Sequence, residues 1–317
     1  MTSSPAAGSR ILATGHRQSG EVVTNDALAE RIETSDEWIR RRVGIRSRWV
    51  ADEPLADLAT GAARMALDES GVDPATIDMV IVATCTAQDR IPNTAAEVAQ
   101  ALGLPNSPAV MDVNVACSGF THALALADHA VRAGSARRAL VIGAEKMSDF
   151  TDWDDRSTAV LLGDGAGAAI IEACDSQEIG PVVWGSQPEL SNAVRIRAQE
   201  GAFAQEGQSV FRWTTTVIPK VARQVCERAG IEPSDLDAVV LHQANLRIIE
   251  PIARSLGLKD NAVVATDVTE SGNTSAASVP MALSKLVHAG QAPSGGKALL
   301  LGFGGGLAWA GQVVTLP

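Results

Sequence analysis

The stretch SGVDPATIDMVIV at residues 70–82 returns in altered form as AGIEPSDLDAVVL at residues 229–241, and 229 − 70 = 159. A second pair repeats at the same offset, since ALVIG at residues 139–143 returns as ALLLG at residues 298–302. Solenoid units have periods of roughly 20–50 residues, so a repeat this long is a duplicated domain.

A third match lies between these two. RAG at residues 132–134 returns as HAG at residues 288–290, at an offset of 288 − 132 = 156. Two like halves pack most simply about a pseudo-twofold axis, and equivalent ends of their elements then meet near that axis. We therefore expect one half at residues 1–172, the other at residues 173–317, and a site that both halves share.

Composition narrows the class of protein. A chain of 317 residues is long enough for two domains of about 150 residues each. The net charge of −11 argues against nucleic-acid binding, which depends on clustered Lys and Arg. No run reaches the roughly 18 apolar residues of a membrane helix, no secretory signal is evident, and the four cysteines lack metal-ligand or disulfide spacing. We expect a cytoplasmic globular protein without a bound metal.

Short apolar runs alternate with longer amphipathic segments along the chain. The apolar runs predict buried strands at residues 79–84, 109–115, 139–142, 166–171, 238–241, 263–266 and 298–301. The amphipathic segments predict helices at residues 55–70, 95–102, 118–133, 217–229, 246–256 and 276–289. This alternation is typical of βαβ units with covered, mostly parallel sheets. Two copies predict a five-layered α/β/α/β/α architecture, with residues 184–210 as a polar connecting segment.

Cys117 lies where an apolar strand turns into an Ala- and Leu-rich helix. Free backbone N–H groups and the positive end of the helix dipole favour the thiolate there, which is the nucleophilic form. The alternative is a buried, inert cysteine, and position alone leaves the two about equally open. Cys85, Cys174 and Cys226 fall in strand or helix patterns, which favours the inert interpretation for them.

Two further polar residues follow the same logic in the second half. His242 ends an apolar strand, and Asn273 lies in a small polar turn before a helix. Because 273 − 117 = 156, the sequence predicts that Asn273 is the counterpart of Cys117. Cysteine can take an acyl group while His and Asn donate hydrogen bonds to an oxyanion or enolate. A packed strand-end histidine and an N-capping asparagine are the alternatives if each is taken alone.

Taken together, the motifs resemble the β-ketoacyl-acyl carrier protein synthase III family of the thiolase superfamily. The resemblance covers nearly the whole chain and is carried by TSDEWI 34–39, ACSGF 116–120, GDGAGA 163–168, HQANLRII 242–249, GNTSAAS 272–278 and FGGG 303–306. It implies a thiolase-like α/β fold and a two-step reaction. Cys117 takes an acyl group from a coenzyme A thioester, and malonyl-acyl carrier protein then loses carbon dioxide and attacks the acyl-cysteine.

The resemblance also implies roles for individual residues. His242 and Asn273 would hold the malonyl thioester oxygen as the enolate forms. The backbone N–H groups of Cys117 and Gly305 would form the oxyanion hole, where glycine lets a carbonyl approach closely. Phe303 and Ile91 would line the acyl pocket. Coenzyme A thioester would be a substrate, and no cofactor would be bound permanently.

Five basic or aromatic residues match the family's contacts to its two substrates. Trp38 would stack on the adenine of coenzyme A with Arg156 on its other face, and Arg42 would lie near the phosphates. Arg212 and Arg247 would dock the acidic carrier protein, so that a local basic rim receives a negative partner.

The local sequence agrees with a coenzyme A site near residue 38. Thr34 and Glu37 match a capping box, which predicts a helix start there. Trp38 and Arg42 are four residues apart, so they would lie on one face of this helix. Arg46 and Arg48 extend the basic run and would also be available for phosphates.

The resemblance implies a homodimer in which residues 88–93 of each subunit cap the acyl pocket of the other. Two alternatives remain open at this stage. The acyl group on Cys117 could pass to a hydroxyl or amine acceptor, or the chain could be a non-catalytic acyl-binding subunit, although such a subunit would be expected to lose the nucleophile. The starter acyl group and the pathway, primary or secondary, stay open.

Overall fold

The computed structural model describes residues 5–197, 199 and 201–317, and these residues form two large sheets of five strands each. The first runs in the order β1 (Gly8–Arg17), β7 (Asp164–Cys174), β6 (Arg138–Lys146), β4 (Met79–Ala83) and β5 (Ala109–Val113). The second, taken from its β8 edge, runs in the order β8 (Val183–Ser186), β14 (Ala308–Thr315), β13 (Lys297–Gly304), β11 (Ala238–Leu241) and β12 (Val263–Val264). Both sheets share one pattern of antiparallel and parallel pairs, which confirms the duplication.

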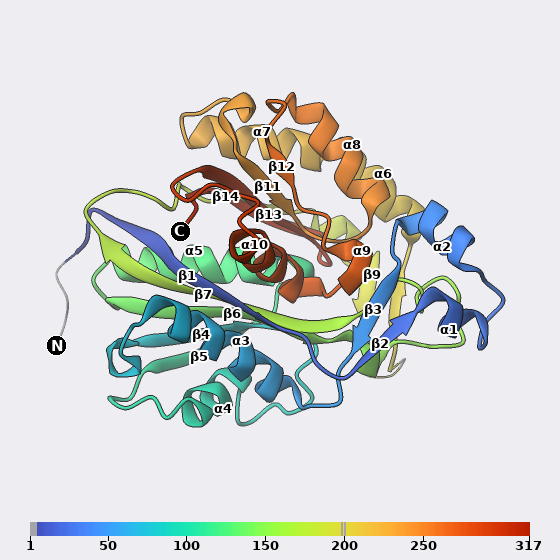
Figure 1. Ribbon diagram of the computed structural model, residues 1–317, viewed down its shortest axis with the longest axis horizontal. Coiled ribbons are helices and arrows are strands. Elements are labelled where there is room, and N and C mark those ends of the chain that lie inside the picture. The colour runs from blue at the N-terminus through green and yellow to red at the C-terminus, as the bar shows by residue number, and fades with distance from the viewer. Residues whose placement is uncertain (1–4, 198, 200) are drawn as a thin grey trace.

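Helices make three further layers around these sheets (Figure 1). The outer face of the first sheet is covered by α3 (Leu55–Ser70) and α4 (Thr94–Ala101). The space between the sheets holds α5 (Gly119–Arg132) and α10 (Ser278–His288). The far face of the second sheet is covered by α7 (Ile218–Arg228) and α8 (Leu246–Leu256). The five-layered α/β/α/β/α architecture predicted from the sequence is therefore confirmed.

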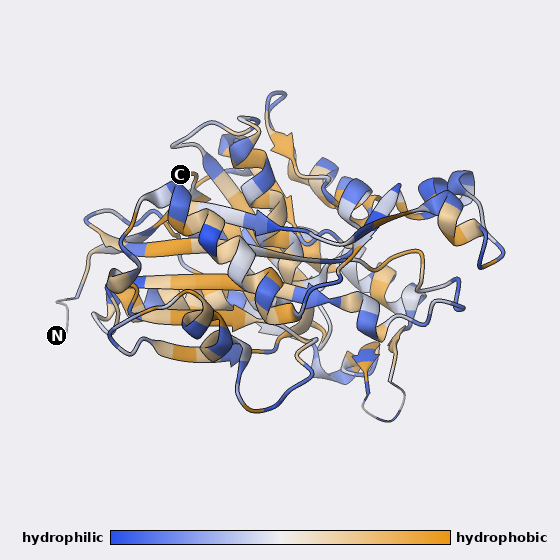
Figure 2. Ribbon diagram, turned by 60° about the horizontal axis from the view of Figure 1, so that its bottom comes forward, coloured by the Kyte–Doolittle hydropathy of each residue, from blue (hydrophilic) through white to orange (hydrophobic). Residues whose placement is uncertain are grey.

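The core is built from strands that are buried on both faces and from small residues on the helices. Every residue of β4 is buried, as expected for a parallel strand covered by helices on each side. Helix α3 turns a stripe of Leu and Ala toward the first sheet. Figure 2 shows the hydrophobic colour concentrated on these interior strands and the hydrophilic colour on the surrounding loops.

Smaller elements extend the molecule at one end (Figure 1). They are β2 (Glu21–Thr24), α1 (Asn25–Ala29), α2 (Asp36–Val43), β3 (Ser47–Val50), β9 (Val194–Ile196), β10 (Phe203–Gln205), α6 (Gly207–Thr216) and α9 (Val268–Ser271). Within the described part of the chain, no helix is long and apolar enough to cross a membrane.

The predicted strands and helices are all present, but some bounds differ. Strands β6 and β7 extend beyond the predicted apolar runs, and β1 and β14 were not predicted. The connecting segment at 184–210 contains most of β8, all of β9 and β10, and the start of α6. The first large sheet ends at Cys174 and the second begins at Val183, and the boundary between residues 172 and 173 stays a prediction.

The predicted equivalence of Asn273 and Cys117 is wrong. Helix α5 has 14 residues and its counterpart α10 has 11. The offset between the two halves therefore falls from 159 to 156 within this pair of helices and not before it. The short turns that precede the two helices, at Ala116–Ser118 and Ser275–Ala277, still differ by 275 − 116 = 159. The counterpart of Cys117 is therefore Ala276.

Asn273 instead corresponds to Asn114, because 273 − 114 = 159. In each half the asparagine Oδ1 accepts a hydrogen bond from the backbone N–H two residues later, at 3.3 Å for Ala116 and 2.9 Å for Ser275. Both of these later residues have positive φ, 43° for Ala116 and 47° for Ser275. The duplication thus places the same tight turn before α5 and before α10.

Candidate active site

A cavity of about 320 Å³ lies where these two turns meet. Its lining comes from both halves and includes Cys85, Asn114, Cys117, Asn273, Ser275 and Gly305. The structure therefore brings Cys117 and Asn273 to one cavity, although they are far apart in the sequence.

Cys117 lies in the turn before α5, and the helix itself begins at Gly119. The end of β13 passes directly over the thiol: a Cβ atom added to Gly304 would be 2.7 Å from Cys117 Sγ. The Ser275 hydroxyl lies 3.6 Å from the same sulfur. Cys117 is partly exposed, and it lines the cavity.

Burial raises the pKa of the Cys117 thiol. Hydrogen bonds from the Ser275 hydroxyl and from the backbone N–H groups of Gly305 and Cys117 oppose this rise, and the nearby Glu145 carboxylate adds to it. The backbone N–H groups thus favour the thiolate as the sequence predicts, but desolvation is the larger effect.

His242 follows β11 and lies behind the cavity wall. Its Nδ1 is 2.8 Å from the Ser278 hydroxyl, and its ring meets Phe303 edge-on with the centroids 5.6 Å apart. Burial lowers the pKa of His242 to about 3, so the imidazole is neutral at physiological pH. His242 is not among the residues that line the described cavity. It contacts Phe303, and the next residue after Phe303, Gly304, covers Cys117.

Asn273 is fixed by both its backbone and its side chain. Its N–H donates to the Leu161 carbonyl at 2.8 Å, and its own carbonyl accepts from Gly163 at 3.1 Å. These bonds join the second half to the first. Because Oδ1 accepts from the Ser275 N–H, the side-chain amide nitrogen is the group left for a ligand.

Trp38 and Arg156 lie together, with the guanidinium carbon 5.0 Å from the ring centroid. Arg156 also donates to the Glu33 carbonyl at 2.9 Å. Arg42 lies one turn further along α2 and is exposed. The three residues predicted to contact coenzyme A thus occupy one end of the molecule.

The capping box predicted for this helix is wrong by one residue. The Ser35 hydroxyl, and not that of Thr34, accepts from the Trp38 N–H at 3.1 Å, and α2 begins at Asp36. Thr34 Oγ1 is buried without a hydrogen-bond partner among the described residues.

The prediction that Arg48 is available for phosphates is also wrong, and that for Arg46 stays a prediction. Arg48 is fully buried, and it donates to two backbone carbonyls and to the Asn25 side chain. Burial lowers its pKa to about 10. Arg46 forms an ion pair with Glu270 at 3.4 Å. A run of arginines in the sequence does not show which of them the fold buries.

The other predicted residues lie at the periphery or in the core. Arg212 and Arg247 are exposed on α6 and α8, and the Arg247 guanidinium lies 6.0 Å from the Phe211 ring centroid. Phe303 is 1% exposed against His242. Ile91 is 91% exposed and lies outside the cavity of its own chain.

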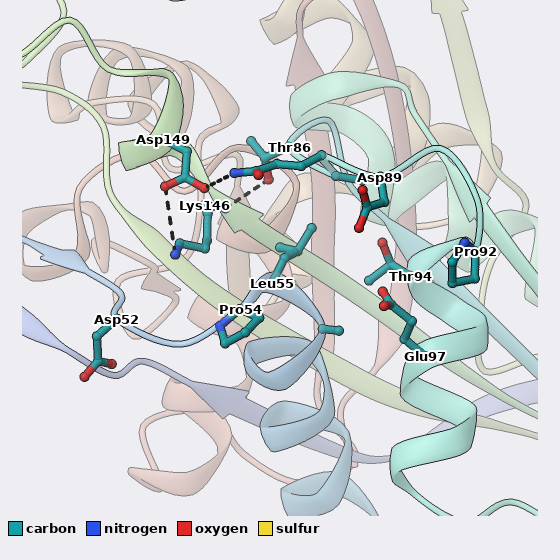
Figure 3. A pocket seen from close by; sticks show the side chains of 13 residues that line it. Asp52, Pro54, Leu55, Thr86, Asp89, Pro92, Thr94, Glu97, Lys146 and Asp149 are labelled. Carbon is teal, nitrogen blue, oxygen red and sulfur yellow. Dashed lines mark hydrogen bonds and ion pairs between the residues drawn. The ribbon is translucent and has the colours of Figure 1, made fainter.

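The loop around Ile91 borders a second cavity of about 340 Å³ (Figure 3). Four carboxylates and one amine line it, from Asp52, Asp89, Glu97, Asp149 and Lys146. None of the predicted catalytic or coenzyme A residues reaches this cavity. Among the described residues, no group of three or more His, Cys, Asp or Glu side chains is arranged to hold a metal.

Three residues at or beside the site, Cys85, Ser275 and Glu145, are not among the site residues that the sequence predicts. The sequence favours an inert Cys85, and burial raises the pKa of its thiol, but the residue lines the cavity, and Ser275 lies between it and Cys117. Glu145 is a fully buried carboxylate on β6. A charged residue at the end of an apolar run was the signal available in the sequence for Glu145.

Comparison with known proteins gives one family. The family model described as 3-oxoacyl-[acyl-carrier-protein (ACP)] synthase III matches residues 111–188, and the model of its C-terminal part matches residues 226–316. Beta-ketoacyl-[acyl-carrier-protein] synthase III 4 of Streptomyces coelicolor is 63% identical over 315 residues, which cover 98% of this chain and 99% of that protein.

Solved structures of related enzymes have a similar fold. A priming beta-ketosynthase from a polyketide biosynthetic pathway is similar with a TM-score of 0.95 and 40% identity, over 100% of this chain and 98% of that one. The 3-oxoacyl-[acyl-carrier-protein] synthase III of Aquifex aeolicus has a TM-score of 0.92 and 37% identity, over 97% of this chain and 100% of that one.

The low pKa of His242 predicts a pH-dependent loss of stability. The unfolded chain takes up a proton on this ring below about pH 6.5, and the folded protein does so only near pH 3, so the stabilisation present at pH 7 is lost as the pH falls through this window. By linkage, His242 alone should account for about 2 kcal/mol of the loss between pH 7 and pH 5. Urea unfolding at both pH values should show a smaller loss for His242→Gln than for the unmodified protein. Equal losses would contradict the assignment.

Proposed function

The chain belongs to the 3-oxoacyl-[acyl-carrier-protein] synthase III family, and we propose how its residues carry out the Claisen condensation by which this acyltransferase starts fatty-acid or polyketide chains. The proposed donor is an acyl-coenzyme A, and the proposed acceptor is malonyl-acyl carrier protein. The observation that carries the proposal is that Cys117 and Asn273, one from each half, line a single cavity.

In the first step Cys117 Sγ attacks the thioester carbonyl of the donor, and coenzyme A leaves. The developing oxyanion is held by the backbone N–H groups of Cys117 and Gly305, which already lie near the sulfur. Residue 304 must be glycine because a Cβ atom there would lie 2.7 Å from Cys117 Sγ, closer than van der Waals contact allows.

In the second step malonyl-acyl carrier protein loses carbon dioxide, and its carbanion attacks the acyl-cysteine. We assign Asn273 Nδ2 and His242 Nε2–H as the donors to the enolate oxygen. Ser278 Oγ lies 2.8 Å from His242 Nδ1, and we assign the hydroxyl as the donor, which leaves the proton of the neutral ring on Nε2. A neutral imidazole suits this role, since it is a weak acid that donates a hydrogen bond to the enolate oxygen without giving up its proton.

The substrate's nucleotide end is assigned to the residues at the end of α2. The Trp38 ring and the Arg156 guanidinium offer two flat surfaces that can sandwich an adenine, and Arg42 supplies a positive charge near the phosphates. Arg212 and Arg247 on the exposed sides of α6 and α8 are assigned to the acidic carrier protein, which local basic charge can attract to a protein of net charge −11.

We also propose that two copies pair through β5. This strand is the edge of the first sheet, and its first residues, Ala109 and Val110, are exposed. An open edge strand presents unpaired N–H and C=O groups to a second strand. Pairing there would carry the exposed Ile91 toward the other subunit's cavity, where residues 88–93 would cap the acyl pocket.

The chemical assignment predicts separate effects on the two steps. Intact-protein mass after incubation with acyl-coenzyme A should show an adduct, which malonyl-acyl carrier protein then discharges as β-ketoacyl product. Cys117→Ala should abolish the adduct. His242→Ala and Asn273→Ala should form it but lower the rate of discharge by about 100-fold or more, as for loss of an oxyanion donor. An adduct that only a hydroxyl or amine acceptor discharges would contradict the assignment.

The proposed coenzyme A site predicts that substitutions in it change KM for acyl-coenzyme A and not for malonyl-acyl carrier protein. Trp38→Ala and Arg156→Ala should raise KM for acyl-coenzyme A by about 10-fold, the usual cost of losing a stacking partner of a base. KM for malonyl-acyl carrier protein should not change. Arg31→Ala is the matched control, because Arg31 is an exposed arginine of the same region that pairs with Asp154 at 3.0 Å. Equal increases in all three variants would refute the site.

The proposed dimer predicts a change in mass. Light scattering coupled to size-exclusion chromatography should give twice the chain mass for the unmodified protein and the chain mass for Val110→Lys, since a buried, unpaired lysine opposes association. Val22→Lys, at an exposed valine on β2, should leave the dimer intact. A dimer that persists in Val110→Lys would place the interface elsewhere.

A further inference from the structure

Glu145 is a fully buried carboxylate for which the two proposed steps have no use. Within the described residues it forms no ion pair, and its hydrogen bonds all come from neutral donors. These donors are Thr84 Oγ1 at 3.1 Å, Thr86 Oγ1 at 2.6 Å, Cys85 N at 3.1 Å, Cys85 Sγ at 3.2 Å and Ala276 N at 3.3 Å. A buried carboxylate without a cation is costly to fold, and Glu145 lies next to the nucleophile's neighbours Cys85 and Ala276.

A continuous path of polar hydrogens connects this carboxylate to the nucleophile. Glu145 Oε1 is 3.2 Å from Cys85 Sγ, which is 3.6 Å from Ser275 Oγ. Ser275 Oγ is in turn 3.6 Å from Cys117 Sγ. All three distances fall within the range of hydrogen bonds that involve sulfur or a carboxylate.

The backbone at Ser275 holds its hydroxyl between the two sulfurs. Its φ of 47° lies in the left-handed region, which non-glycine residues adopt at a cost and which is common at functional sites. The Asn273 side chain fixes this turn by accepting from the Ser275 N–H. The strained turn thus gives the hydroxyl two sulfur neighbours at equal distance.

We propose that Ser275 and Cys85 form a proton relay that carries the thiol proton of Cys117 to Glu145 as Cys117 is acylated. This inference rests on the proposed role of Cys117 as the nucleophile. The relay residues act through the sulfur of Cys117 and not on the substrate itself, so Cys85 and Glu145 are positioning residues.

The step balances in atoms and charge. The Cys117 Sγ–acyl bond forms, the coenzyme A sulfur–acyl bond breaks, and its electron pair leaves on the coenzyme A thiolate, which takes a proton from water. At rest the Ser275 hydroxyl donates to Cys117 Sγ, and it turns to donate to Cys85 Sγ. The Cys117 proton then moves to Ser275 Oγ, the Ser275 proton to Cys85 Sγ, and the Cys85 proton to Glu145. When the condensation expels Cys117, the same path returns the proton to its sulfur, and the enzyme is reset.

The surrounding groups favour Glu145 as the acceptor. Burial raises the pKa of Glu145, which makes its carboxylate a stronger base, whereas burial lowers the pKa of His242 to about 3 and makes it a poor one. The titratable groups that face Cys117 are Cys85 and Glu145; Arg195 lines the same cavity, and His242 lies behind Phe303.

Glu145→Gln separates the relay from other roles of the carboxylate. Removal of its charge should lower the pKa of Cys117 and speed alkylation by iodoacetamide at pH 7, measured on the Cys117 peptide by mass spectrometry. Removal of the proton acceptor should slow acylation by acyl-coenzyme A about 100-fold in single-turnover experiments. If both reactions slow, Glu145 only maintains the local structure, and if both speed up, it acts only as a charge; either result overturns the relay.

Cys85 provides an independent test. Cys85→Ala interrupts the path and should slow acylation by about 10-fold or more, and Cys85→Ser, which restores a donor and acceptor, should recover most of the lost rate. Asp164→Asn is the matched control: Asp164 is another buried carboxylate with neutral donors, Ser148 and Ala51, and it should leave both reactions unchanged.

The outcomes distinguish the relay from the function on which it rests. If the unmodified protein forms no adduct on Cys117, the proposed function fails. If it forms the adduct, and Glu145→Gln and Cys85→Ala form it at the same rate, only the relay fails.

Discussion

The close packing of two equivalent turns, one before α5 and one before α10, is the constraint on which this structure depends. The turn before α10 is buried and the turn before α5 is partly exposed to the cavity, and small residues allow them to touch: a Cβ atom added to Gly119 would lie 3.3 Å from Ala276 Cβ. A Cβ atom on Gly143 would lie 2.3 Å from the Ala276 carbonyl oxygen, so this position of β6 in the first sheet must also lack a side chain. Because each turn precedes a helix packed against both sheets, neither can move without disturbing the core. The nucleophile from one half and the amide from the other are thereby held at one cavity.

Desolvation follows from this packing and sets the chemistry of each group. It raises the pKa of Cys117, lowers that of His242 and raises that of Glu145. The same low dielectric strengthens every hydrogen bond that faces the substrate. A site built in this way stabilises charge that develops during the reaction better than charge that is present at rest. It therefore requires a defined route for the proton of the thiol.

The sequence predicted much of this arrangement because the duplication and the apolar periodicity are local signals. Helices α3 and α8 and strand β11 match their predicted bounds to the residue, since each is bounded by a glycine, a proline or a polar cluster. Three features escaped prediction for physical reasons. The three-residue difference between α5 and α10 lies inside a regular helix, where no turn residue marks it. Arg48 is buried and donates to the Val160 carbonyl 112 residues away, and Cys85 meets Ser275 across 190 residues, so both depend on tertiary contacts alone.

A comparison within the first sheet shows why Glu145 lacks a cation. Glu172 on β7 accepts from Arg10 and Arg138, and these guanidinium groups hold its pKa below the usual range. A carboxylate paired in that way stays ionised and is a weak base, which suits a structural ion pair. Glu145 on the neighbouring strand receives hydrogen bonds only from hydroxyl, thiol and amide groups, and burial raises its pKa. The neutral donors hold the carboxylate in place and lower its pKa less than burial raises it. A group that must take up a proton and return it in each cycle needs both a fixed position and a raised pKa.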